Sequence, residues 1–196
     1  MKRITLFSTL TDTNKKRILD QIFPIELTNK TLAYMPSEGV KGAQEYINQW
    51  QIIAQEYGAK FNVINNQIRS VEEQDKIRTS NILVISGGNT FNLLDNIRKS
   101  GLEISIRQFL DKPDFVLSGF SAGALVLTPN IKICNLPNFD NNMIELKDLE
   151  ALNIVDFEIF PHFNKDIHKE MLRDYRRATD NRVCEITDED YINVDL

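Results

Sequence analysis

The chain has 196 residues, of which 42% are hydrophobic and 26% charged, the balance of an ordinary soluble globular protein. Its net charge of −5 argues against a nucleic-acid binder, and no apolar stretch approaches the roughly 20 residues that span a bilayer. Residues 1–8 are too polar for a signal peptide and the two cysteines form no C-x-x-C pair, so we expect a cytoplasmic protein without a disulfide framework or zinc site.

Short apolar runs alternate along the chain with longer segments of helical spacing. Residues 42–57 show this spacing clearly, with Ile47, Trp50 and Ala54 on one side and Gly58 at the end. The predicted strands are residues 4–7, 32–35, 61–64, 82–85, 115–117, 154–160, 183–186 and 191–194. The predicted helices are residues 13–23, 42–57, 91–99, 103–110 and 165–178.

This alternation predicts an α/β fold with three layers, α/β/α, around a mainly parallel sheet. Residues 82–85 are entirely apolar, which is typical of a central strand covered on both faces. The last two strands, 183–186 and 191–194, are expected to close the fold as a pair. Because no linker, repeat or low-complexity tract interrupts the chain, we interpret residues 1–196 as a single domain.

The segment Gly119-Phe120-Ser121-Ala122-Gly123 matches the pattern G-x-S-x-G directly after a predicted strand. A nucleophile at such a strand-to-helix turn, or nucleophile elbow, needs small neighbours, because the turn closes tightly around a strained residue. The pattern therefore predicts Ser121 as the nucleophile. The alternative is a glycine-rich strand end that only packs tightly.

Two consecutive glycines, Gly87 and Gly88, follow the central apolar strand. Glycines allow the backbone to approach a ligand closely and to expose N–H groups. We expect the N–H groups of Gly88 and Ala122 to form an oxyanion hole for the nucleophile. The alternatives are a phosphate-binding turn or a helix N-cap made by Asn89 or Thr90.

The chain has two histidines. His162 follows Pro161 at the end of a predicted strand, where α/β sheets carry their functional loops. His168 lies within a charged helical segment, where a solvated surface side chain is expected. We therefore favour His162 over His168 as the general base for Ser121.

Three motifs together resemble the peptidase E (aspartyl dipeptidase) family of serine peptidases: Gly88-Asn89-Thr90-Phe91, Gly119-Phe120-Ser121-Ala122-Gly123-Ala124 and Pro161-His162-Phe163. The resemblance covers most of the chain and implies a fold similar to class I glutamine amidotransferase domains. It also implies a serine-type exopeptidase or dipeptidase, with Ser121 as nucleophile and His162 as base. Such an enzyme acts on short peptides, needs no metal or organic cofactor, and is expected as a monomer or homodimer.

The sequence departs from this family's pattern at two places. The acidic triad residue is expected soon after the serine, where this chain has Asn135-Leu136-Pro137; Asp140 is the predicted replacement, and Asn135 is an amide alternative. Members that prefer N-terminal aspartate carry His-Lys-Gly-Glu-Thr-Arg, where this chain has His168-Lys169-Glu170-Met171-Leu172-Arg173. Arg173 is therefore the candidate for binding the substrate carboxylate of an Asp-X dipeptide.

Two other functions fit the same motifs. The missing carboxylate at Leu136 also fits a non-catalytic descendant that binds a small acidic ligand or a protein partner, although Ser121 and His162 are retained. An esterase or lipase of the α/β-hydrolase type shares G-x-S-x-G, but the chain is short for that fold and has no His-Gly-Gly motif.

Overall fold

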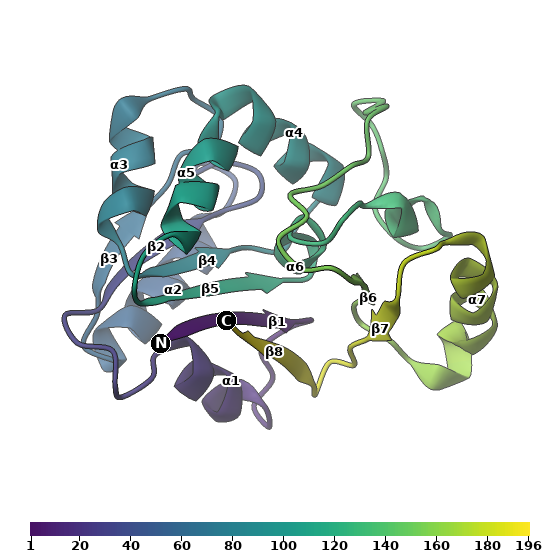
Figure 1. Cartoon of the computed structure of the whole chain (residues 1–196), viewed down its shortest axis with the longest axis horizontal. Helices are drawn as coiled ribbons and strands as arrows, with labels where there is room; N and C mark the ends of the chain where they lie inside the picture. The colour runs from purple at the N-terminus through teal and green to yellow at the C-terminus, as the bar shows by residue number, and fades with distance from the viewer.

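The computed structural model describes all residues, 1–196, and is built around one large sheet (Figure 1). The strands are β1 (Lys2–Phe7), β2 (Thr31–Met35), β3 (Lys60–Val63), β4 (Ile82–Ile85), β5 (Phe115–Phe120), β6 (Glu158–Phe160), β7 (Val183–Glu185) and β8 (Tyr191–Asp195). The helices are α1 (Lys15–Ile22), α2 (Gln44–Glu56), α3 (Val71–Thr79), α4 (Thr90–Ser100), α5 (Leu102–Leu110), α6 (Ala122–Leu125) and α7 (Lys165–Ala178), with a 3-10 turn η1 (Lys132–Asn135).

Six strands form the large sheet in the order β3-β2-β4-β5-β1-β8. Neighbouring strands run parallel, except that β8 is antiparallel to β1 at the edge. Alternate side chains of each strand point to opposite faces. On one face they pack with α1 and α2, and on the other with α3, α4 and α5. The predicted α/β class and mainly parallel sheet are confirmed.

The structure differs from the predicted elements at both the third helix and the last strands. Helix α3 was not predicted, because its sequence is polar and only Glu73 and Ile77 are buried. The expected pairing of the last two strands is wrong: β7 pairs with β6, and β8 pairs with β1. None of the helices combines the length and the apolar character needed to cross a membrane.

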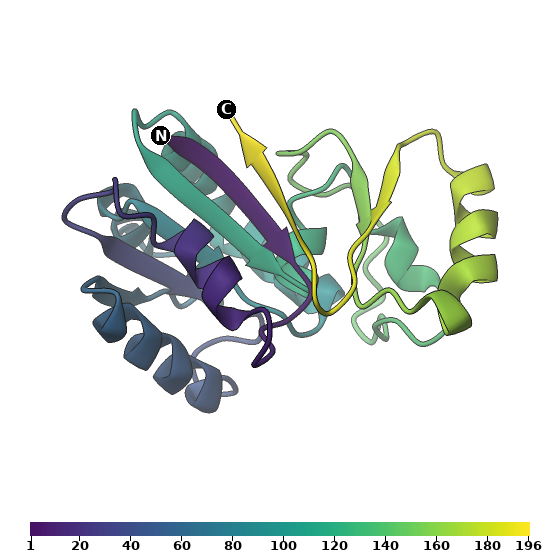
Figure 2. The same ribbon diagram turned by 90° about the horizontal axis from the view of Figure 1, so that it is seen from below.

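A smaller unit made of β6, β7 and α7 lies beside the large sheet, at the right of Figures 1 and 2. Its centre is the carboxylate of Glu158, which is 1% exposed. Burial alone would raise the pKa of this carboxyl group, but hydrogen bonds from Tyr175, Asn181, Thr179 and Asn130 outweigh burial and hold the pKa below its ordinary value. The ionised side chain thus joins β6 to α7 and to the turn that follows this helix.

We expect Glu158→Gln to lower the free energy of unfolding by about 1–3 kcal/mol at neutral pH. The glutamine has an NH2 group in place of one carboxylate oxygen, so some of the donors around it lose their buried, charged acceptor. The folded pKa is lowered, so the stabilisation is present above the ordinary pKa of 4.5 and is lost as the pH falls through the folded value. Urea unfolding at neutral and acidic pH should show that the difference in the free energy of unfolding between variant and wild type becomes smaller on acidification. A gap that does not change with pH would contradict this account.

Candidate active site

Ser121 occupies a strained turn between β5 and α6. Its backbone has φ 49° and ψ −117°, a conformation that non-glycine residues rarely adopt. The turn closes because the residues two positions before and after Ser121 are glycines: a Cβ atom at Gly119 would lie 2.3 Å from the carbonyl oxygen of Gly123, and one at Gly123 would lie 2.0 Å from that of Ile85. The N–H of Ser121 donates to the carbonyl of Phe7, 3.0 Å away. The alternative of a strand end that only packs tightly does not account for a strained serine.

His162 lies beside Ser121 and contacts it directly. The Nε2 atom of His162 is 3.0 Å from Ser121 Oγ, and its Nδ1 atom is 2.6 Å from a carboxylate oxygen of Asp188. Because a carboxylate only accepts, Nδ1 carries the proton and Nε2 is free to accept from the serine hydroxyl. The three side chains form one line of hydrogen bonds at the carboxyl ends of β5, β6 and β7.

The carboxylate at His162 is not the one expected from the sequence. Asp140 instead accepts hydrogen bonds from the backbone N–H and the hydroxyl of Thr90, at the start of α4. Asn135 lies in the 3-10 turn η1 and is not a hydrogen-bond partner of the His162 ring. Asp188 was missed because it belongs to a charged surface loop, Thr187–Asp190, with nothing in its local sequence to distinguish it from its acidic neighbours.

Of the two predicted oxyanion donors, Ala122 directly follows Ser121 and Gly88 lies in the turn after β4. Gly88 has φ 141° and lines the same hollow as Ser121, and a Cβ atom there would lie 1.9 Å from Ser37 Oγ. Ala122 is the first residue of α6, so its N–H has no acceptor within the helix. Asn89 caps α4 through its side chain, so this turn serves a helix as well as the site.

Two hollows adjoin the Ser121–His162 pair, which lines both. The first has a volume of about 290 Å³ and includes Asp140, His168 and the rings of Phe139 and Phe160. The second has a volume of about 310 Å³ and lies between the Gly87-Gly88 turn and the start of α2. The first hollow is lined by one carboxylate, that of Asp140, and the second by that of Glu38. Neither hollow is lined by Lys or Arg.

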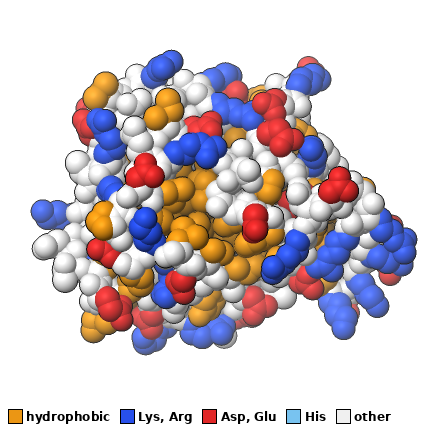
Figure 3. Space-filling model, viewed as in Figure 1, with side chains coloured by type: hydrophobic (Ala, Val, Ile, Leu, Met, Phe, Trp, Pro, Cys, Tyr) orange, Lys and Arg blue, Asp and Glu red, His pale blue; other side chains and the backbone are white.

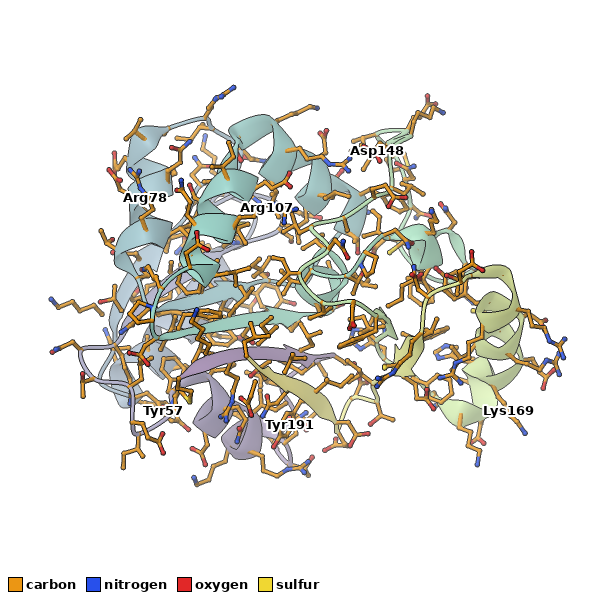
Figure 4. The ribbon with its side chains drawn as sticks, viewed as in Figure 1. Tyr57, Arg78, Arg107, Asp148, Lys169 and Tyr191 are labelled. Atoms are coloured by element: carbon orange, nitrogen blue, oxygen red, sulfur yellow. The ribbon has the colours of Figure 1, made fainter.

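The structure places Arg173 away from Ser121. Its guanidinium is half exposed on α7, paired with Glu170 and Asp174, and lines a separate hollow that does not include the serine. Basic side chains gather over this helix in Figure 3, and Figure 4 shows Lys169 among the charged side chains that point away from the sheet. The expected contact between Arg173 and a substrate at Ser121 is therefore not supported.

His168 is not hydrogen-bonded to Ser121, and it is not a freely solvated side chain. Its Nδ1 atom accepts the N–H of Asn164, and its ring packs on Phe160 with centroids 5.2 Å apart. Cys134 does not compete as a nucleophile, because burial raises the pKa of its thiol to about 12. Ser121 is the residue whose hydroxyl lies within hydrogen-bonding distance of a histidine ring.

Known peptidases resemble this chain in both sequence and fold. The model of peptidase family S51 matches residues 4–195. An uncharacterized peptidase of Pasteurella multocida is 29% identical over 165 residues, or 83% of this chain and 78% of that protein. Peptidase E of Nostoc sp. is 30% identical over 139 residues, or 70% of this chain and 54% of that protein. A crystal structure of a peptidase E-like protein from Listeria monocytogenes shares the fold, with a TM-score of 0.76 and 24% identity over 100% of this chain and 99% of that one.

Proposed function

Since the chain belongs to peptidase family S51, we propose that it is a serine-type exopeptidase that hydrolyses short peptides with Ser121, His162 and Asp188. The observation that carries this proposal is the unbroken line of hydrogen bonds from Asp188 through His162 to Ser121. A hydroxyl paired with a base, which is itself oriented by a third group, is the arrangement that activates a nucleophile.

The geometry supports a two-step hydrolysis. Ser121 Oγ attacks the scissile carbonyl carbon while His162 Nε2 takes its proton; the leaving amine then receives that proton, and an acyl-enzyme remains on the serine. Water, activated by the same imidazole, attacks the acyl-enzyme and releases the acid. Asp188 holds the ring in the tautomer that leaves Nε2 free, and its charge stabilises the imidazolium that forms.

The N–H groups of Gly88 and Ala122 are the proposed oxyanion donors. When the carbonyl becomes tetrahedral, negative charge develops on its oxygen, and fixed backbone donors stabilise this charge without reorganising. The position of Gly88 in the hollow shared with Ser121 supports this role, as does the lack of an acceptor within α6 for Ala122.

The charges around the serine favour a substrate with a positive group near the scissile bond. Asp140 lines one hollow and Glu38 the other, without a Lys or Arg in either. When a short peptide is cleaved after its first residue, its free ammonium group lies two bonds from the reacting carbonyl carbon. The side-chain carboxylate of an N-terminal aspartate would instead be repelled by Asp140 and Glu38. The charges of the cleft therefore give no basis for a preference for Asp-X dipeptides.

The two alternative functions have less support than the proposed one. The non-catalytic interpretation depends on a missing carboxylate near Leu136, but Asp188 places a carboxylate at His162. The α/β-hydrolase esterase interpretation does not fit membership of family S51. The cytoplasmic location, the lack of a cofactor and the monomeric or homodimeric state remain predictions from the sequence.

We expect Asp188→Asn to lower kcat by about 10³- to 10⁴-fold, because an amide at Nδ1 favours the wrong tautomer of His162. Asp190→Asn is the matched control: Asp190 lies in the same loop but accepts from Thr187 and does not contact the histidine. Labelling by a fluorophosphonate probe should be fast in wild type and in Asp190→Asn, slow in Asp188→Asn and absent in Ser121→Ala. Equal labelling of wild type and Ser121→Ala would rule out the proposed nucleophile.

We expect Lys-Ala and Ala-Ala to be cleaved with a higher kcat/KM than Asp-Ala. A partly exposed pair of charges changes the interaction free energy by up to about 1 kcal/mol. Each of the two carboxylates in the cleft, Asp140 and Glu38, should therefore contribute a preference of up to about fivefold over Asp-Ala. Asp140→Asn should reduce the difference, and Arg173→Ala should leave it unchanged. A clear preference for Asp-Ala that is lost in Arg173→Ala would contradict this assignment and restore the role first expected for the arginine.

A further inference from the structure

The last residue of β1 and the segment that leads from it to α1 contact the backbone of every member of the proposed triad. The carbonyl of Phe7 accepts from the N–H of Ser121 at 3.0 Å. The hydroxyl of the next residue, Ser8, accepts from the N–H of His162 at 2.9 Å. Further along, the side-chain amide of Asn14 donates to the carbonyl of Asp188 at 2.6 Å.

Ser8 is buried, and its hydroxyl both donates and accepts a hydrogen bond. It is 1% exposed, and besides accepting from His162 it donates to the carbonyl of Ile186 at 3.0 Å. Ile186 directly follows β7 and lies two residues before Asp188. The hydroxyl of Ser8 therefore links the end of β1 both to His162 and to the segment that carries Asp188. Because β6 and β7 form a separate sheet, no strand pairing with β1 performs this task.

His162 needs such an anchor because its own backbone is strained. Its φ of 54° lies in the left-handed region, which is unfavourable for a residue with a side chain. Its side chain is 44% exposed, so packing holds the ring only in part. The hydrogen bond from its N–H to Ser8 therefore helps to fix the direction in which the ring leaves the backbone.

Asn14 is also used in an unusual way. It stands at the N-cap position of α1, where an asparagine side chain normally accepts from a helical N–H, but it makes no such bond. Instead its amide donates to the carbonyls of Thr9 and Asp188, and its oxygen accepts from the N–H of Thr11. The side chain is 0% exposed, so these bonds form in the interior.

We propose that Ser8 and Asn14 are positioning residues of the proposed peptidase, which hold His162 and Asp188 in register with Ser121. Neither reacts with the substrate; each acts through the backbone of a triad residue. This inference rests on the proposed function, but its geometric part, the alignment of His162 with Asp188, does not require turnover.

The test compares Ser8→Ala and Asn14→Ala with two matched controls. Ser118 is a buried serine whose hydroxyl donates to the carbonyl of Thr5 within the sheet. The side chain of Asn81 bonds the backbone of Thr31 and Thr28 at the opposite end of the sheet. Ser118→Ala and Asn81→Ala therefore remove the same kinds of bond and report the cost to stability alone.

We expect Ser8→Ala and Asn14→Ala to lower kcat by about 10- to 100-fold, because small misplacements of catalytic groups have effects of this size. KM should change by less than about threefold, since uniform substrate binding is retained. Both controls should keep the wild-type kcat while losing a similar amount of stability in thermal unfolding. If each variant loses no more activity than its control, the positioning role is refuted.

The NMR signal of the His162 Nδ1 proton gives a readout that does not depend on substrate. We expect a downfield, slowly exchanging proton in wild type and both controls, and a weakened or absent signal in Ser8→Ala. An unchanged signal in Ser8→Ala would overturn the inference even if the peptidase is active. A wild-type protein that shows the signal but fails to label at Ser121 would instead refute the proposed function.

Discussion

The packing of the serine turn against the end of β4 is the constraint on which the site depends. Gly123 approaches the carbonyl of Ile85 so closely that even a methyl group there would lie 2.0 Å from the oxygen. The turn therefore packs against the last residue of β4 without room for a side chain at Gly123. Because β4 continues into Gly87-Gly88, the nucleophile and the proposed oxyanion donors meet through the adjacency of two strands. The pairing of β4 with β5 thus positions this half of the site.

The other half of the site is brought in by the edge of the same sheet. Phe120 at the end of β5 pairs with Phe7 at the end of β1, and Phe7 pairs with Tyr191 at the start of β8. Since β8 is antiparallel, the loop that precedes it lies at the carboxyl ends of β1 and β5, and Asp188 belongs to that loop. His162 arrives from β6, whose position is stabilised by the buried Glu158. Figure 4 shows Tyr191 on the edge strand, close to α1.

The amino-acid sequence predicts the parts of this arrangement that depend on local patterns. The apolar run of β4 predicts a central strand, and small residues around Ser121 predict a tight turn after a strand. Local pattern does not predict Asp188, because its role depends on the antiparallel pairing of β8 with β1. That pairing differs from the expected one between the last two strands. Asp140 is predicted instead only because it follows the serine closely, near the position where the resembled family carries its acidic residue. The sequence pattern does not predict helix α3 either, because a helix with so few buried side chains has only a weak hydrophobic periodicity.

The central claim is that a strained serine, an imidazole and two backbone amides converge on one point. A crystal structure of the protein after reaction with a fluorophosphonate tests it most directly, since the adduct resembles the tetrahedral intermediate. The account predicts phosphorus bonded to Ser121 Oγ, with the phosphonyl oxygen facing the N–H groups of Gly88 and Ala122 and with His162 still bonded to Asp188. An adduct on another residue, or an oxygen turned away from both amides, would contradict it.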